Sequence, residues 1–141
     1  MSTVLSEKRI NHYLGLAKNA SEFSDFPQHK LGAVLIEKNR VVSVGFNSKK
    51  ENPIQKHLNK LRGYDVEKAH NSLHAEVHTL LKAKDLDIEW NKTSLFIYRQ
   101  HKDGHKALAK PCAACSQMIK QLGIKNIYYT GDDSIVYERV D

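Results

Sequence analysis

The chain has 141 residues, 40% of them hydrophobic and 27% charged, which is the size and composition of an ordinary soluble globular domain. Its formal net charge of +6 favours anionic ligands such as nucleotides or nucleic acid, although scattered lysines are equally compatible with a solvated surface. No apolar run approaches the roughly 18 residues of a membrane span, and the N-terminal sequence lacks a signal-peptide pattern, so we expect a cytoplasmic protein with no membrane partner.

The first third of the sequence predicts a helix and a β-hairpin. Residues 6–20 carry apolar side chains at helical spacing, and Ser6 is a suitable N-cap. Residues 31–37 and 40–46 are two β-branched runs separated by two polar residues, which is typical of a tight hairpin.

The middle of the chain is harder to interpret. Residues 47–70 are polar, so they form either a functional loop or a loop that hides a short helix at 54–62. The following segment, 72–86, has apolar residues at helical spacing, with Asn71 or Ser72 as its expected cap.

The last third of the sequence alternates strands with a helix. The expected elements are a buried strand, a turn, a helix and two further strands, at 94–99, 103–104, 111–123, 124–130 and 134–140. Pro111 suits the first helical position and Gly123 suits the C-terminal cap. This alternation predicts an α/β sandwich whose later strands are joined by helical crossovers. Without a repeat or linker in the sequence, we expect residues 1–141 to form a single domain.

Two segments carry residues that bind metals, and each alone suggests a different protein class. The sequence His-Ala-Glu-Val-His at 74–78 is similar to the metallopeptidase pattern His-Glu-x-x-His. Its glutamate lies one position too late, however, which moves the carboxylate about 100° around a helix. The Cys-x-x-Cys at 112–115 is also found in thioredoxin-like redox proteins. That fold requires a strand with a cis-proline after the cysteines, and no proline follows them in this sequence. The position of the glutamate disfavours a metallopeptidase, and the missing proline disfavours a thioredoxin-like protein.

Taken together, the two segments suit a zinc site. His74, Cys112 and Cys115 would supply three ligands of a tetrahedral zinc ion and leave the fourth position open. Glu76 would lie close to the metal without binding it. A water molecule beside a carboxylate that moves protons suits the hydrolysis of an amidine-like carbon.

The order His-x-Glu followed by Pro-Cys-x-x-Cys resembles the zinc-dependent cytidine/deoxycytidylate deaminase superfamily. Residues 31–47 also resemble the first hairpin of that family, and residues 123–131 resemble the strand after its second zinc helix. The resemblance implies a three-layer α/β/α sandwich with a mixed five-stranded sheet, a Zn²⁺ cofactor and, in most members, a homo-oligomer.

The resemblance also implies roles for individual residues. His74, Cys112 and Cys115 would bind zinc, with water or hydroxide as the fourth ligand, and Glu76 would carry protons to the ring nitrogen and the leaving amine. Substrate contacts would come from the backbone of Ala75, from Asn47 at the sugar, and from a lysine that neutralises a phosphate: Lys49, Lys50 or Lys30. His78 is expected either to support a zinc ligand or to be a half-buried core histidine.

The substrate is expected to be a small cytosine nucleotide or nucleoside. A histidine as first ligand favours the deoxycytidylate and nucleic-acid branches, although Pro-Cys-Ala-Ala-Cys-Ser-Gln is similar to the free cytidine enzymes. We therefore expect a hydrolytic deaminase with dCMP as the favoured substrate. The alternatives are a deaminase acting on cytosine or adenine in single-stranded nucleic acid and an inactive zinc or nucleic-acid-binding module.

Overall fold

The computed structural model describes residues 5–26, 29–51, 53–61 and 72–140. Its elements in chain order are α1 (Glu7–Ser21), β1 (His29–Glu37), β2 (Arg40–Phe46), β3 (Ser48–Glu51), α2 (Pro53–Leu61), β4 (Ser72–Leu73), α3 (Ala75–Ala83), the 3₁₀ turn η1 (Trp90–Lys92), β5 (Thr93–His101), β6 (Lys106–Ala107), α4 (Ala113–Leu122), β7 (Asn126–Thr130) and β8 (Ile135–Arg139).

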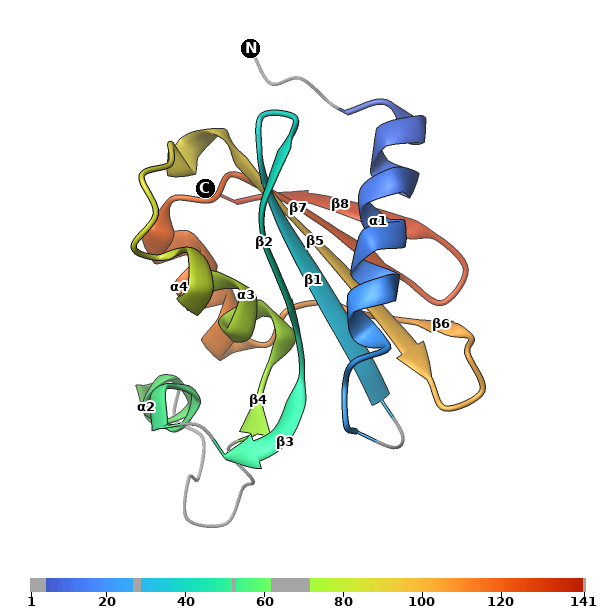
Figure 1. The fold of residues 1–141 in the computed structure, drawn as a ribbon, viewed down its shortest axis with the longest axis horizontal. Coiled ribbons are helices and arrows are strands. Elements are labelled where there is room, and N and C mark those ends of the chain that lie inside the picture. The colour runs from blue at the N-terminus through green and yellow to red at the C-terminus, as the bar shows by residue number, and fades with distance from the viewer. Residues whose placement is uncertain (1–4, 27–28, 52, 62–71, 141) are drawn as a thin grey trace.

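Five strands form a mixed sheet in the order β2-β1-β5-β7-β8, and the short β6 pairs with the end of β5. Helix α1 covers one face of this sheet, whereas α3 and α4 cover the other (Figure 1). Strands β3 and β4 form a separate two-stranded sheet. The expected mixed five-stranded sheet between helices is therefore confirmed. No helix of the described residues is long and apolar enough to cross a membrane.

Helix α1 forms where the apolar spacing predicted it. The Ser6 side chain caps the helix by accepting a hydrogen bond from the Arg9 N–H at 3.3 Å. The buried face of the helix, which includes Tyr13, Leu14 and Ala17, packs on the sheet side chains that point toward it, among them Val34, Phe96 and Tyr128. This layer closes one side of the sheet and leaves the other side to α3 and α4.

Gly32 is expected to be essential for the close packing of α1 on β1. A Cβ atom at this position would lie 1.9 Å from the Ala17 carbonyl oxygen and 2.5 Å from the Ser21 nitrogen, both of which are backbone atoms. Gly32→Ala should therefore destabilise the protein by about 2–3 kcal/mol, as overpacking does, which urea unfolding would measure. Gly15→Ala is the control, because a Cβ at Gly15 meets nothing within 4 Å and alanine favours the helix by about 1 kcal/mol. Equal stability of the two variants would contradict this expectation.

The connections between the strands decide at which end of the sheet α3 and α4 begin. Strands β1 and β2 are antiparallel and turn at Lys38, which adopts a left-handed φ of 58°. Strands β5 and β7 are parallel and are joined through α4, as predicted, whereas β7 and β8 form an antiparallel hairpin without a helix between them. Because α3 leads into β5 and α4 follows it, both helices run back along β5. Their first residues therefore lie at the C-terminal end of β5 (Figure 1).

Three details differ from the sequence-based expectations. Helix α3 begins at Ala75 with His74 as its N-cap, not Asn71 or Ser72, because the Leu73 backbone pairs with Ser48 and keeps the chain extended to that point. Helix α4 begins at Ala113 with Cys112 as its N-cap, so Pro111 precedes the cap instead of occupying the first helical position. The polar segment does contain a helix, α2, at Pro53–Leu61, and the prediction for the rest of it falls on residues 62–71, outside the described residues.

Candidate active site

His74, Cys112 and Cys115 come together at the start of α3 and α4. Their ligand atoms all lie within 4.8 Å of one another. The Nδ1 atom of His74 is 3.2 Å from the Cys115 sulfur and 3.5 Å from the Cys112 sulfur. His74 and Cys112 are the N-caps of their helices, and Cys115 is in the first turn of α4. Because both helices begin at the C-terminal end of β5, His74 and Cys115 lie together although they are 41 positions apart in the chain.

The geometry and chemistry of this group suit zinc. With typical bond lengths of about 2.1 Å to nitrogen and 2.3 Å to sulfur, tetrahedral coordination separates the two donor atoms by about 3.6 Å. The observed separations of 3.2 and 3.5 Å between nitrogen and sulfur are close to this value. One imidazole and two thiols leave one position open, as catalytic zinc sites require.

The two thiols differ in their affinity for a proton. A hydrogen bond from Cys115 holds the pKa of Cys112 at about 4, and the same bond together with burial raises the pKa of Cys115. Burial alone would lower the pKa of His74, but the hydrogen bond to Cys112 and the charge of Glu76 raise it overall. Cys112 is therefore a thiolate at neutral pH, and the positive N-terminus of α4 favours that charge.

Glu76 is a buried carboxyl group beside these ligands. Its side chain belongs to a residue that is 3% exposed, and its Oε1 atom is buried without a hydrogen-bond partner among the described residues. Burial raises its pKa, while the neighbouring His74 opposes this shift. A buried carboxyl oxygen without a partner is costly unless a ligand or water meets it. Glu76 can therefore hold or release a proton next to the group of three ligands.

Gln55 on α2 was not predicted as a functional residue, yet it holds His74 in place. It is fully buried, and its Oε1 atom accepts a hydrogen bond from the His74 backbone N–H at 3.2 Å. Its Nε2 atom donates to Asn59 Oδ1 at 3.0 Å, which fixes the orientation of the amide. Because the His74 ring points to the cysteines and caps no backbone group, Gln55 supplies an acceptor at the start of α3.

Gln55→Leu is expected to weaken zinc binding about 10- to 100-fold, the usual effect of removing a residue that orients a metal ligand. The reason is that the His74 backbone would lose its bond to Gln55. Competition with a chelator would measure the affinity, and Co²⁺ spectra would report the ligand geometry. Ser43→Ala is the matched control, because it removes a buried hydrogen bond to the Thr79 carbonyl of the same helix. If both variants lose zinc to the same extent, Gln55 has no specific role.

The structure places the three expected substrate-binding residues as follows. Ala75 is the first residue of α3 and is fully buried, so its N–H has no acceptor within the helix. Asn47 follows β2 and is fastened to β1, since its Oδ1 accepts from the Leu31 N–H and its Nδ2 donates to the His29 carbonyl, both at 3.0 Å. Lys49 is exposed on β3, whose partner strand β4 leads directly to His74.

His78 is half-buried and supports the end of β2. Its Nδ1 atom lies 3.1 Å from both the N and the O atom of Phe46, and the two rings meet edge to face with centroids 4.9 Å apart. Burial lowers its pKa, which favours the neutral ring. Of the two roles expected for His78, these contacts fit the half-buried packing residue. They hold the strand that precedes Asn47.

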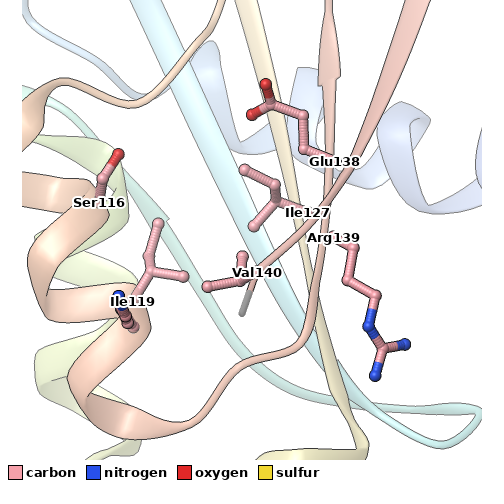
Figure 2. Close-up of a pocket in the computed structure, with 7 residues that line it drawn as sticks. Ser116, Ile119, Ile127, Glu138, Arg139 and Val140 are labelled. Atoms are coloured by element: carbon pink, nitrogen blue, oxygen red, sulfur yellow. The ribbon is translucent and has the colours of Figure 1, made fainter.

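A groove of about 370 Å³ lies between α4 and the β7–β8 hairpin (Figure 2). It is lined by Ser116, Ile119, Lys120, Ile127, Glu138, Arg139 and Val140. None of the residues expected to bind zinc or substrate lines this groove, so it is separate from the candidate site.

A known family model matches most of this chain. Residues 7–131 match the family model described as the cytidine and deoxycytidylate deaminase zinc-binding region. No curated protein sequence gives a match.

Solved structures with a similar fold include the dCMP deaminase of cyanophage S-TIM5 in apo form, which is 22% identical over 92% of this chain and 88% of that chain, with a TM-score of 0.64. The same enzyme in complex with dCMP and dUMP is 22% identical over 89% and 83% of the two chains, with a TM-score of 0.63. The cytidine deaminase of Burkholderia pseudomallei is 18% identical over 96% and 94%, with a TM-score of 0.65. These likenesses confirm the expected fold.

Proposed function

This chain belongs to the cytidine and deoxycytidylate deaminase family that shares a zinc-binding region, and from that premise we propose that it is a zinc-dependent hydrolytic deaminase. It converts a cytosine nucleotide or nucleoside, with dCMP as the favoured substrate, to the uracil form and ammonia. The observation that carries the proposal is the buried Glu76 carboxyl, whose Oε1 atom has no partner among the described residues, beside a His-Cys-Cys group.

His74, Cys112 and Cys115 would hold the metal. Zinc in such a site supplies a Lewis acid that makes water acidic near neutral pH. The His-Cys-Cys donor set is the one used by zinc deaminases, in which a conserved glutamate serves as the general acid and base.

Groups of the protein transfer the protons and orient the base. Glu76 accepts a proton from water through a carboxylate oxygen and delivers it to the ring nitrogen of the base. The water oxygen forms a bond to C4, the bond from C4 to the amine breaks, and the second water proton leaves with ammonia. The elevated pKa of the buried Glu76 suits a group that both takes and gives a proton. The Ala75 N–H, at the start of α3, would donate to the base.

The basic character of the chain supports a nucleotide as substrate, for which Asn47 and Lys49 are the expected contacts at the sugar and the phosphate. The net charge of +6 raises the local concentration of anions, and a solved relative of similar fold binds dCMP and dUMP. A His74 ligand in place of cysteine points the same way, because it favours the deoxycytidylate branch.

The test is zinc content together with ammonia release from dCMP, deoxycytidine, cytidine, adenosine and single-stranded DNA. We expect about one zinc per chain and the highest kcat/KM for dCMP. Release from adenosine or DNA but not from free cytosine compounds would replace the proposed substrate. Zinc binding without ammonia release from any of them would instead indicate an inactive module.

A further inference from the structure

Three side chains that can bind anions gather at the C-terminal end of β5: Arg99, His101 and, from the neighbouring β1, His29. The Nη2 atom of Arg99 is 3.0 Å from Nδ1 of His29, and the rings of His29 and His101 meet edge to face with centroids 5.9 Å apart. An open basin of about 620 Å³ is lined by His29, His101, Lys102 and Asp103. We propose that Arg99, His101 and His29, here called the Arg99 cluster, bind the phosphate of a mononucleotide substrate. The proposal rests on the deaminase function proposed above.

The Arg99 cluster lies on the same face of the sheet as the zinc ligands. Side chains alternate between faces along a strand. Leu95 and Ile97 pack in the core beneath α3 and α4, so Arg99 and His101 point to that face as well. His29 is opposite His101 in the antiparallel register and shares its face. Lys30 is opposite Gln100, which bonds to Ser21 of α1, so Lys30 faces away from this cluster.

The cluster also lies at the correct end of the sheet. Helices α3 and α4 both begin at the C-terminal end of β5 (Figure 1), which is the end that carries Arg99 and His101. The Nη1 atom of Arg99 donates to the Leu108 carbonyl at 3.2 Å, and the chain then leads through Pro111 to Cys112. A nucleotide whose base is at Glu76 would extend its phosphate along this face.

Asn47 connects the cluster to the expected sugar site. Its side-chain amide donates to the His29 carbonyl at 3.0 Å, so the residue expected at the sugar is adjacent to the backbone of the cluster. A nucleotide with its sugar at Asn47 would therefore have its 5′-phosphate close to His29.

The donors of the cluster are suited to an anion. Arg99 takes part in none of the ion pairs found among the described residues, and its Nε is buried without a hydrogen-bond acceptor there. A guanidinium group has no acceptor atom, so His29 Nδ1 must accept from it, and the His29 proton is then on Nε2, which can donate. Asp103, the acidic residue of the basin, is paired with His105 at 2.9 Å. Since both terminal nitrogens of Arg99 already donate within the protein, the cluster offers the positive charge of the guanidinium, its unpartnered Nε–H and the His29 imidazole donor, a combination that phosphate accepts.

The experiment compares dCMP with deoxycytidine in the zinc-loaded enzyme. Arg99→Gln should lower kcat/KM for dCMP about 10- to 100-fold, mainly through KM, because a charged hydrogen bond to phosphate is lost. Its kcat/KM for deoxycytidine, which has no phosphate, should stay within about twofold. Arg99→Lys keeps the charge without the planar fork and should restore part of the dCMP activity. Lys106→Gln is the matched control: it removes one positive charge on β6 opposite Gln100, on the other face, and should alter neither substrate.

Calorimetric binding of dUMP and deoxyuridine to the same variants separates this proposal from the proposed function. Arg99→Gln should weaken dUMP binding and leave deoxyuridine unchanged even if the enzyme releases no ammonia from any cytosine compound. Equal losses for the phosphorylated and unphosphorylated compounds, or no loss for either, would overturn the Arg99 cluster as a phosphate site. A loss confined to single-stranded DNA would also overturn it and would assign the cluster to nucleic acid.

Discussion

Glu76→Gln is expected to lower kcat for the favoured cytosine substrate by at least about 100-fold, within the range of 10²–10⁴ that general acid–base catalysis contributes. Glutamine has nearly the same shape but cannot take a proton from water or pass it to the ring nitrogen. Because Glu76 is buried and its pKa is raised by burial, the neutral amide should fit without a loss of stability. Ammonia release and zinc content would be measured together.

Two comparisons make this result specific. Glu76→Asp keeps the carboxyl group but shortens its reach by one methylene, so activity should fall less than in Glu76→Gln while zinc content stays constant. Glu22→Gln changes an exposed carboxylate at the end of α1 and should leave activity unchanged. If Glu76→Gln and the wild type release ammonia at equal rates, Glu76 is not the proton carrier and the proposed mechanism is wrong.

The parts of the fold that depend on local sequence could be predicted. Helix α1 follows from apolar spacing and the Ser6 cap, and the β1–β2 hairpin follows from two β-branched runs around a short polar turn. Helix α4 ends at Gly123 with a φ of 96°, a conformation that glycine adopts readily. In each case the deciding interactions join residues close together in the chain.

Features decided by contacts between distant segments were missed. The start of α3 depends on the pairing of Ser48 with Leu73, which no helix signal near Leu73 reveals. Pro111 was placed inside α4 because proline suits a first helical turn, but the Cys112 side chain accepts from the Cys115 N–H and takes the cap position. A thiolate in that position is set by the metal motif and not by general cap preference.

In the candidate site, too, the residues with a local sequence signal could be predicted, and those that depend on contacts between distant segments could not. The motif predicts His74, Glu76, Cys112 and Cys115 as site residues because their types and spacing are specific, and the crossover brings the histidine and the two cysteines together. Gln55 lies in a polar segment where an amide carries no distinguishing signal, and its bond to His74 spans 19 residues. Arg99 and His29 are 70 residues apart, and only the antiparallel register of β1 and β5 makes them neighbours.

Cys115→Ser is expected to abolish zinc binding and, with it, ammonia release. Cys115 is fully buried, and its sulfur is 3.2 Å from His74 Nδ1. A serine hydroxyl is a much poorer ligand than a thiolate, so the remaining His74 and Cys112 would hold the metal weakly. In the wild type, zinc present at about 1,000 times its dissociation constant should stabilise the fold by about 4 kcal/mol and raise Tm by about 10 °C. Cys115→Ser should show no such rise when zinc is added.

Ser116→Ala controls for a change in the same turn of α4, because its hydroxyl donates to the Pro111 carbonyl and not to a ligand. This variant should bind zinc as the wild type does and show the same rise in Tm. Cys112→Ser and His74→Ala should behave like Cys115→Ser, since each removes one of three ligands. Full zinc content in any one of these three variants would remove that residue from the ligand set. Loss of zinc in all three, with Ser116→Ala unaffected, is the result that the geometry of the site requires.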